Sequence, residues 1–329
     1  MIQAINSMDE GSSRRAAFAR QLPPFGVGCG TLANADGAAA FAGMIEQAFA
    51  SGVKYFDTAA LYLGGESERR LGMALRPHAR TSFLVSTKIG RRLDVAEPGA
   101  DAGGVKSIFD YSADETLRSI ETSLKNLSLD FIDLVMIHDL SRYIHKQSYD
   151  ARIDEAMNGA YEALLSLRKG GTIGAIGVAA MDWTSCMDLA RLGDFDAFMP
   201  AGQYTLLNQA CNPLLDHCIS HGATVIAASP FNSGILATGA IDGAIYNMQP
   251  ASPALLRRVA AIEAVCRRHG VPLAAAAIQF PLRHKAVSTV VAGCRSAAEF
   301  LLNRELRTRN IPGALWAELE SIAEDSIPA

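Results

Sequence analysis

The chain has 329 residues, 49% hydrophobic and 19% charged, a composition typical of a large globular protein. Its formal net charge of −4 and its lack of long lysine or arginine runs argue against a nucleic-acid partner. No segment approaches the ~20 apolar residues that a membrane-spanning helix needs, so the sequence predicts no membrane partner either.

The beginning of the chain and its cysteines indicate the compartment. Residues 1–24 contain polar and Arg/Ala-rich patches without the apolar core of a signal peptide, and we expect them to form a flexible leader. The six cysteines, at positions 29, 186, 211, 218, 266 and 294, form no C-x-x-C pair and no zinc-type cluster. We therefore expect reduced, mostly buried thiols, no metal, and a cytoplasmic protein.

Apolar runs alternate with amphipathic segments of helical length along residues 25–329. In chain order, the pattern predicts strand 25–30, helix 37–51, strand 53–57, helix 66–76, strand 82–88, helix 112–127, strand 131–137, helix 152–169, strand 173–178, helix 182–192, strand 196–203, helix 208–221, strand 223–228, helices 254–269 and 272–284, strand 286–292, and helices 296–304 and 312–325. Each of these strands is followed by a helix.

Continuous apolar strands indicate a parallel sheet covered by helices, so the fold class is α/β. The number and order of the elements favour a single-domain (β/α)8 TIM barrel over residues 25–329. The alternative is a doubly wound sheet, which would carry G-x-G-x-x-G after its first strand. Gly26, Gly28 and Gly30 alternate, but no third glycine of that motif follows, and we interpret them as packing positions at the strand end.

Four reactive side chains lie at or just after the ends of three successive predicted strands. Asp57 and Lys88 end two of these strands, His138 follows the next one, and Tyr62 lies in the loop after Asp57. In a barrel the chemistry takes place at the C-terminal ends of the strands. An acid, a phenol, an amine and an imidazole at one such edge predict a proton-transfer site centred on the tyrosine.

The motifs around these residues resemble those of the aldo-keto reductases. They are F-D-T-A-x-x-Y-x-x-G-x-S-E-x-x-L-G at 56–72, S-T-K at 86–88 and D-L-V-M-I-H-D at 133–139, and the resemblance covers roughly residues 25–305. Within the family the chain is similar to the D-threo-aldose (L-fucose) 1-dehydrogenase and pyridoxal 4-dehydrogenase branch. The resemblance implies a TIM barrel, a nicotinamide cofactor, and a catalytic tetrad of Asp57, Tyr62, Lys88 and His138.

Elementary acid–base chemistry assigns consistent roles to this tetrad. An unperturbed tyrosine has a pKa near ~10, too high for an efficient base at neutral pH. We expect the Lys88 ammonium to favour the phenolate of Tyr62 and so to lower its pKa. Asp57 would keep Lys88 charged and in position, and His138 would hydrogen-bond the substrate oxygen.

The resemblance also implies a set of cofactor contacts. Gln203 matches the glutamine that meets the nicotinamide carboxamide, and Tyr204 the aromatic residue that stacks on the ring, although a core-facing aromatic is an equal alternative. The remaining residues match the pyrophosphate loop (Ser229, Phe231, Ser233, Gly234 and Leu236) and the adenosine end of the site (Gly293, Arg295, Ser296, Glu299 and Asn303).

Departures from the family pattern bear on the cofactor. NADP-dependent members often have lysine where Gly293 stands and arginine where Glu299 stands. The carboxylate favours NAD because it would repel a 2′-phosphate, whereas Arg295 could pair with that phosphate and keeps NADP open. The usual Ser-Asn after the fifth strand is replaced by Ala180 and Met181, which cannot make the amide contact to the carboxamide.

These features predict NAD-dependent oxidation of a cyclic hemiacetal to a lactone, with Tyr62 as general base. The small-molecule substrate would be an aldose, such as L-fucose, D-arabinose or L-galactose, or pyridoxal. One alternative is an NADPH-dependent reductase of small aldehydes or ketones, and a less favoured one is a non-catalytic, cofactor-binding regulatory subunit. We expect the protein to be a monomer or a small homo-oligomer.

Overall fold

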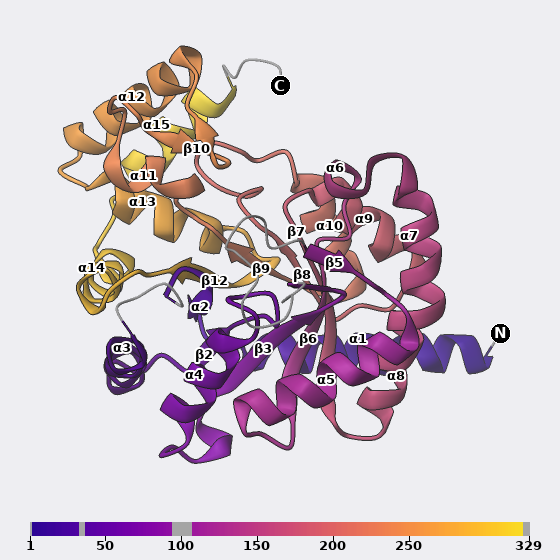
Figure 1. The fold of residues 1–329 in the computed structure, drawn as a ribbon. Coiled ribbons are helices and arrows are strands. Elements are labelled where there is room, and N and C mark those ends of the chain that lie inside the picture. Colours follow the sequence, from indigo (N-terminus) through magenta and orange to yellow (C-terminus); the bar gives the residue numbers. More distant parts are fainter. Residues whose placement is uncertain (1, 33–36, 94–106, 325–329) are drawn as a thin grey trace.

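The computed structural model describes residues 2–32, 37–93 and 107–324, and side-chain positions are described for most of them. Figure 1 shows a central barrel of strands surrounded by helices. The barrel strands are β1 (Phe25–Gly28), β2 (Tyr55–Asp57), β3 (Leu84–Ile89), β6 (Ile132–His138), β7 (Ile173–Ala180), β8 (Ala197–Pro200), β9 (Thr224–Ala228) and β12 (Val287–Gly293). All are parallel and close in the order β1-β12-β9-β8-β7-β6-β3-β2, which confirms the predicted (β/α)8 fold.

Helices cover the outside of the barrel. They are α3 (Ala38–Ala50), α4 (Glu66–Leu75), α5 (Ala113–Leu127), α7 (Tyr149–Glu155), α8 (Glu162–Lys169), α9 (Trp183–Leu192), α10 (Asn212–His221), α12 (Pro253–Arg268), α13 (Leu273–Gln279), α14 (Ala297–Thr308) and α15 (Gly313–Glu324). A π-helical turn, η3 (Ala156–Tyr161), joins α7 to α8, so the helix predicted at 152–169 is one continuous element from 149 to 169.

Shorter elements lie mainly in the loops. They are α2 (Cys29–Leu32), α6 (Arg142–His145), α11 (Ile235–Thr238), the 3₁₀ turns η1 (Arg80–Ser82), η2 (Lys146–Ser148), η4 (Asn232–Gly234) and η5 (Phe280–Arg283), and two ribbons, β4 (Arg91–Leu93) with β5 (Ser107–Phe109) and β10 (Ile245–Tyr246) with β11 (Gln249–Pro250). The helix predicted at 272–284 is therefore split into α13 and η5, where Pro281 follows Phe280 and cannot continue the helical hydrogen bonds.

Glycines in β1 and α2 make room for two tyrosine side chains, one from β2 and one from the loop after it. A Cβ atom on Gly26 would lie 2.5 Å from Cδ1 of Tyr55, and one on Gly30 would lie 3.2 Å from the ring of Tyr62. Real Cβ contacts are almost never as short as the first of these. These glycines therefore serve packing, as expected, and not phosphate binding.

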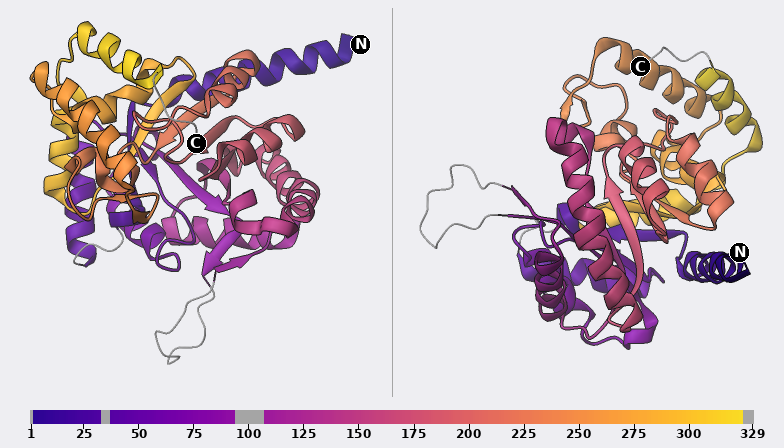
Figure 2. Two further views of the ribbon diagram at one scale, coloured as in Figure 1. Left: turned by 90° about the horizontal axis from the view of Figure 1, so that it is seen from above. Right: turned by 90° about the vertical axis from the view of Figure 1, so that its right-hand side faces the viewer.

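Residues 11–22 contradict the expected flexible leader. Helix α1 (Ile2–Gln21) lies across the N-terminal end of the barrel, and its first turns extend beyond it (Figure 2). Phe18 and Leu22 are buried in the cluster that fills the barrel interior, together with Tyr55, Met136 and Met199.

Charged contacts also hold α1 in place. Arg14 Nε donates to Asp196 Oδ1 at 2.9 Å, and its Nη2 pairs with Asp194 at 2.8 Å. Arg15 Nε donates to the carbonyl of His221 at 2.7 Å. The prediction failed because the polar and Arg/Ala-rich composition of this segment conceals two apolar anchors, Phe18 and Leu22, and an ion pair from Arg14 to the buried Asp196.

Candidate active site

The four predicted catalytic residues lie together at the C-terminal end of the barrel. Asp57 is the last residue of β2, Lys88 lies near the end of β3, and His138 ends β6. Adjacent strands hold them in register, since Asp57 is paired with Ser86 and Lys88 with Met136. Tyr62 reaches the same place from the loop after β2, and its ring centroid lies 6.2 Å from that of His138.

Lys88 is the centre of a buried hydrogen-bonded cluster. Its Nζ donates to Asp57 Oδ2 at 2.7 Å and to the carbonyl of Thr58 at 2.8 Å, and it lies 3.4 Å from the hydroxyl of Tyr62. Burial opposes the charge on Lys88, but Asp57 and Tyr62 stabilise it, and the pKa of Lys88 is raised above its ordinary value. The lysine is therefore an ammonium at neutral pH.

Two residues that the sequence did not single out support Asp57. Ser86 Oγ donates to Asp57 Oδ1 at 2.6 Å, and the hydroxyl of Tyr55 lies 2.8 Å from the same serine oxygen. Both side chains are fully buried. Ser86 belongs to the S-T-K motif, so the sequence did carry a signal for it. With one oxygen on Lys88 and the other on Ser86, the Asp57 carboxylate is fixed in orientation.

Burial dominates the acidity of Tyr62. Removal from water raises the pKa of its phenol, Asp57 and Asp139 raise it further, and Lys88 lowers it by charge and hydrogen bond. The effect of Lys88 has the expected sign, but the net pKa lies above the ordinary value and not below it. Tyr62 is therefore a phenol at neutral pH, able to donate a proton to a substrate oxygen directly.

His138 is neutral. Burial lowers its pKa to about 4, and Lys88 and Arg91 act in the same direction, while Asp139 opposes them. Its backbone carbonyl accepts a hydrogen bond from the hydroxyl of Tyr111 at 3.0 Å. A neutral imidazole beside a phenol and an ammonium can donate one N–H to a substrate oxygen while Tyr62 exchanges a proton with it.

The residues predicted to meet the nicotinamide differ in their placement. Gln203 is half-buried directly after β8, and its backbone N–H donates to Pro200. Tyr204 instead packs against Phe280, with ring centroids 5.2 Å apart, and against His284 at 5.7 Å. Its ring thus lies in the helical layer with η5, which favours the core-facing interpretation over ring stacking. The orientation of Tyr204 is thus set by Phe280 and His284, which are distant in the sequence.

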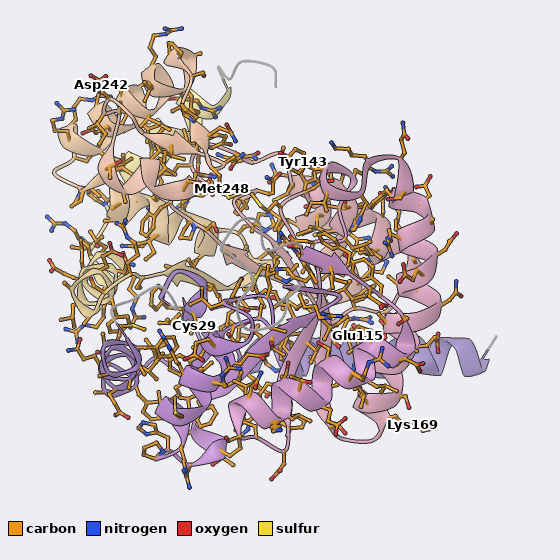
Figure 3. The ribbon with its side chains drawn as sticks, viewed as in Figure 1. Cys29, Glu115, Tyr143, Lys169, Asp242 and Met248 are labelled. Carbon is orange, nitrogen blue, oxygen red and sulfur yellow. The ribbon has the colours of Figure 1, made fainter. Side chains whose placement is uncertain are left out.

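The predicted pyrophosphate loop has an unusual backbone after β9. Ser229 and Ser233 have φ values of 57° and 60°, and Gly234 follows at 104°. The N–H groups of Ser229 and Gly234 donate to the backbone carbonyls of Val291 and Phe231. Phe231 is half-buried, and Leu236 is fully buried, so the side chain of Leu236 packs into the core. Ser233 Oγ accepts a hydrogen bond from the N–H of Met248, which is exposed on a neighbouring turn (Figure 3).

Asn232, in the same loop, was missed by the sequence analysis. It is 1% exposed, its φ is 46°, and its Nδ2 donates to the carbonyl of Gly202 at 3.0 Å. Its Oδ1 is buried with no protein partner in the described part of the chain. A buried acceptor on a side chain bonded to Gly202 fits a site that receives an amide donor of a nicotinamide cofactor.

The predicted adenosine end lies where β12 meets α14. Gly293 ends β12 exposed, and Ser296 caps α14 by accepting a hydrogen bond from the N–H of Glu299. Arg295 Nη2 and Nε lie 2.8 and 3.0 Å from Glu299 Oε1, so these two side chains neutralise each other. Asn303 points inward, with Nδ2 3.5 Å from Sγ of Cys294.

The residues at the end of β7 differ from the Ser-Asn of the family pattern. Ala180 ends β7 buried and Met181 is 40% exposed, so the departure from Ser-Asn leaves an apolar position at this edge of the barrel.

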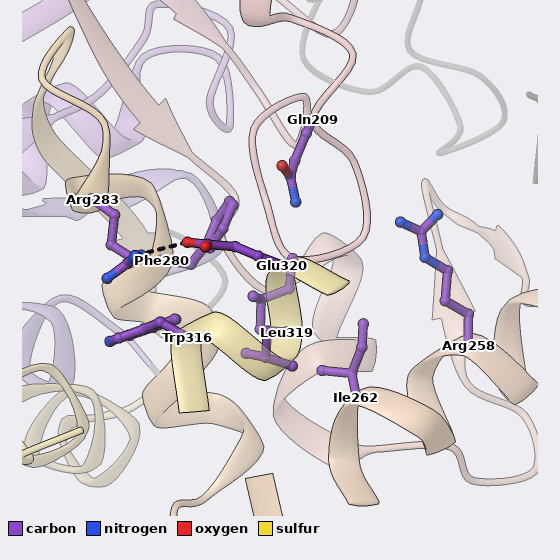
Figure 4. Close-up of a pocket in the computed structure, with 9 residues that line it drawn as sticks. Gln209, Arg258, Ile262, Phe280, Arg283, Trp316, Leu319 and Glu320 are labelled. Atoms are coloured by element: carbon purple, nitrogen blue, oxygen red, sulfur yellow. Dashed lines mark hydrogen bonds and ion pairs between the residues drawn. The ribbon is translucent and has the colours of Figure 1, made fainter. Parts of the chain in front are cut away.

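A cavity of about 20 Å³ lies apart from the tetrad, between α12, η5 and α15 (Figure 4). Arg283 and Glu320 line the cavity and form an ion pair at 2.9 Å, and the cavity has room for about one water molecule.

The sequence of this chain matches the model of the Aldo/keto reductase family over residues 26–324. The chain belongs to the aldo/keto reductase family. It is 37% identical to a D-threo-aldose 1-dehydrogenase from Pseudomonas sp. over 92% of this chain and 95% of that protein. It is 32% identical to a pyridoxal 4-dehydrogenase from Microbacterium luteolum, with 84% and 86% covered.

Solved structures agree on the fold. An aldo-keto reductase from Bacillus halodurans, in its holo form, superposes with a TM-score of 0.73 at 22% identity, covering 92% of this chain and 93% of that one. Membership of the family makes the chain an NAD(P)-dependent oxidoreductase acting on a small molecule. No helix in the described ranges is both long and apolar enough to cross a membrane, and no group of acidic, histidine or cysteine side chains there could hold a metal ion.

Proposed function

We propose that this aldo/keto reductase oxidises a cyclic hemiacetal to a lactone with NAD+, using Asp57, Tyr62, Lys88 and His138. The observation that carries the proposal is the buried ammonium of Lys88, 2.7 Å from Asp57 and 3.4 Å from the hydroxyl of Tyr62. A lysine buried to this degree with one carboxylate and one phenol supports a proton-transfer role over that of a solvated strand end.

The reaction balances without a further reagent. The C–H bond of the hemiacetal carbon breaks and its electron pair leaves as hydride, for which the nicotinamide is the acceptor when bound. The hydroxyl proton passes to the oxygen of Tyr62, and a C=O bond forms. Lys88 stabilises the phenolate that accepts this proton, Asp57 holds Lys88, and the N–H of His138 orients the substrate oxygen.

The preference for NAD+ is supported by the pair formed by Arg295 and Glu299. The guanidinium that could bind a 2′-phosphate already has Glu299 as its partner, at 2.8 Å. A second anion at this place would meet the Glu299 carboxylate, whereas a free ribose 2′-hydroxyl can donate to it.

An aldose or pyridoxal is the proposed substrate class because both curated relatives named above carry such substrates in their names. L-Fucose, D-arabinose, L-galactose and pyridoxal, as its internal hemiacetal, all present a hydroxyl and a hydrogen on one carbon. We further propose that the enzyme acts in the cytoplasm as a monomer or small homo-oligomer, without nucleic-acid or membrane partners.

One observation favours the runner-up, an NADPH-dependent reductase of small aldehydes or ketones. The raised pKa of Tyr62 keeps it protonated at neutral pH, which suits a general acid in reduction. In oxidation the same raised pKa requires that the rate increase with pH, since the phenolate must be formed first.

The experiment that separates these functions compares initial rates for the four hemiacetals with NAD+ and NADP+, and for small aldehydes with NADH and NADPH. The proposal expects the highest kcat/KM for one of the hemiacetals with NAD+, and loss of that activity in Tyr62→Phe. Faster aldehyde reduction with NADPH would establish the runner-up instead. Any measurable turnover lost in Tyr62→Phe excludes a purely regulatory subunit.

A further inference from the structure

A buried ion pair outside the tetrad lies directly against His138. Asp139 follows His138 at the end of β6, is 7% exposed, and pairs with the guanidinium of Arg91 on the β4–β5 ribbon. The same oxygen, Asp139 Oδ2, lies 3.5 Å from Nε2 of His138. The proposed reaction gives neither Asp139 nor Arg91 a role.

The fold holds both members of the pair firmly. Asp139 has a φ of 55°, a left-handed conformation that few non-glycine residues adopt, and its N–H donates to the carbonyl of Ala179 at 2.8 Å. Arg91 Nη2 donates to Ser107 Oγ at 3.2 Å, and its guanidinium lies 5.2 Å from the ring centroid of Phe109. Both charges are thus held in place by hydrogen bonds and by the ring of Phe109.

The two nitrogens of His138 have unequal surroundings. Nδ1 is buried and has no hydrogen-bond partner in the described part of the chain, whereas Nε2 faces the Asp139 carboxylate. A proton on Nδ1 would be a buried donor without an acceptor, while a proton on Nε2 is attracted by the carboxylate. At 3.5 Å the carboxylate is too distant for a strong hydrogen bond, so this proton stays available to another acceptor.

We propose that Asp139 and Arg91 are a positioning pair that keeps His138 neutral with its proton on Nε2, ready to donate to the substrate oxygen. Asp139 selects the nitrogen that carries the proton. Arg91 offsets the Asp139 charge, so the carboxylate neither stabilises a doubly protonated ring nor withdraws the N–H from the substrate. This inference rests on the proposed role of His138 in the reaction.

The other charged and titratable groups near His138 do not replace this pair. Lys88 on β3 repels a proton from the ring, as Arg91 does, while Tyr62 faces it edge-on as a neutral phenol. Asp139 is the acid that raises the pKa of His138, and burial is the main cause that lowers it. Removing Arg91 should therefore raise the pKa of His138, and removing Asp139 should lower it.

The test observes His138 itself, by side-chain NMR of 15N- and 13C-labelled histidine in the full-length protein, with His138→Gln to assign the signal. The wild type should be neutral from pH 5 to 9, as the Nε2–H tautomer. Arg91→Met should raise the pKa of His138 by at least one unit, and Asp139→Asn, which tolerates a positive φ, should give a mixture of tautomers.

Two controls keep the test decisive. Arg91→Lys retains the charge and should restore the wild-type titration. Arg92→Met removes the neighbouring arginine of the same ribbon, which pairs with Glu115 at 2.9 Å away from His138, and should change nothing.

Wild-type tautomer and titration in both Arg91→Met and Asp139→Asn would overturn the inference, whatever their activity. If the wild type is instead inactive on every hemiacetal, the proposed function fails while the NMR test of the pair still stands or falls on its own result.

Discussion

At the scale of single residues, the site consists of a few buried groups whose charges are set by their neighbours. Lys88 is charged because Asp57 accepts from it at 2.7 Å, and His138 is neutral because it is buried beside Lys88 and Arg91. Tyr62 lies beside both Lys88 and His138. Burial raises the pKa of Tyr62, and Lys88 lowers it. The chemistry of Tyr62, a loop residue, therefore depends directly on residues at the ends of the strands, above all Lys88 on β3 and Asp57 on β2.

Replacing Tyr62 by phenylalanine should remove most turnover and leave cofactor binding unchanged. Only the hydroxyl is lost, and the ring still fills the space against Gly30. General acid–base catalysis typically contributes ~10²–10⁴-fold, so kcat should decrease by a factor in that range. Steady-state kinetics and a fluorescence titration with NADH measure the two quantities, and near-normal kcat would remove Tyr62 from the proposed role.

Replacing Lys88 by methionine should change the pH dependence of oxidation. Oxidation needs the phenolate, so its rate increases as pH rises through the pKa of Tyr62. Without Lys88 nothing in the tetrad lowers that pKa, and the increase should move to higher pH. An unchanged pH profile of the residual activity would show that Lys88 is structural.

The variant should also be less stable, because Asp57 would remain buried without its cation. Breaking a buried pair in this way typically costs ~3–5 kcal/mol. Adding Asp57→Asn to Lys88→Met should recover part of that loss in a denaturant titration, while turnover stays low.

At the scale of elements, loops after the strands carry the proposed cofactor site. The loop after β9 is tied to the loop after β8 by the bond from Asn232 to the carbonyl of Gly202. A side-chain hydrogen bond contributes ~0.5–1.5 kcal/mol, so Asn232→Ala should weaken NADH binding by a factor between about 2 and about 13. Asn158→Ala, at an exposed asparagine on η3, is the matched control, and equal Kd values for both variants would contradict the assignment.

The start of α14 should control the choice of cofactor. Glu299→Arg removes the carboxylate, frees Arg295 from its ion pair, and should raise the ratio of kcat/KM for NADP+ over NAD+ about tenfold, which needs only ~1.4 kcal/mol. Glu305→Arg makes the same charge change farther along the exposed face of α14 and should leave the ratio unaltered. A wild-type preference for NADP+ would mean that Arg295 dominates.

The sequence predicted the proximity of Asp57, Lys88 and His138 because parallel strands bring their ends to one edge of the sheet. Their catalytic roles stay a prediction. It did not predict that Tyr204 packs on Phe280, since that contact depends on the placement of a distant helix. The roles of Asn232 and Asp139 depend on positive φ angles and buried atoms, which no spacing pattern reveals.

At the scale of the whole molecule, α1 closes the end of the barrel opposite the site. Phe18 contributes to the interior cluster, and Phe→Ala in a core typically costs ~3–5 kcal/mol. Phe18→Ala should therefore lower the free energy of unfolding by about 3 kcal/mol while kcat stays at its wild-type value. A thermal or denaturant melt checks this, and an unchanged stability would return residues 1–24 to the status of a flexible leader.

The central claim is that the buried tetrad oxidises a hemiacetal with NAD+. The most direct measurement follows the absorbance of reduced cofactor when the wild type and Tyr62→Phe are given L-fucose, D-arabinose, L-galactose or pyridoxal with NAD+ or NADP+. We expect the wild type to reduce NAD+ faster than NADP+ with at least one of these substrates, and Tyr62→Phe to lose that activity. No reduction of NAD+ with any of them, or equal rates in the variant, would contradict the claim.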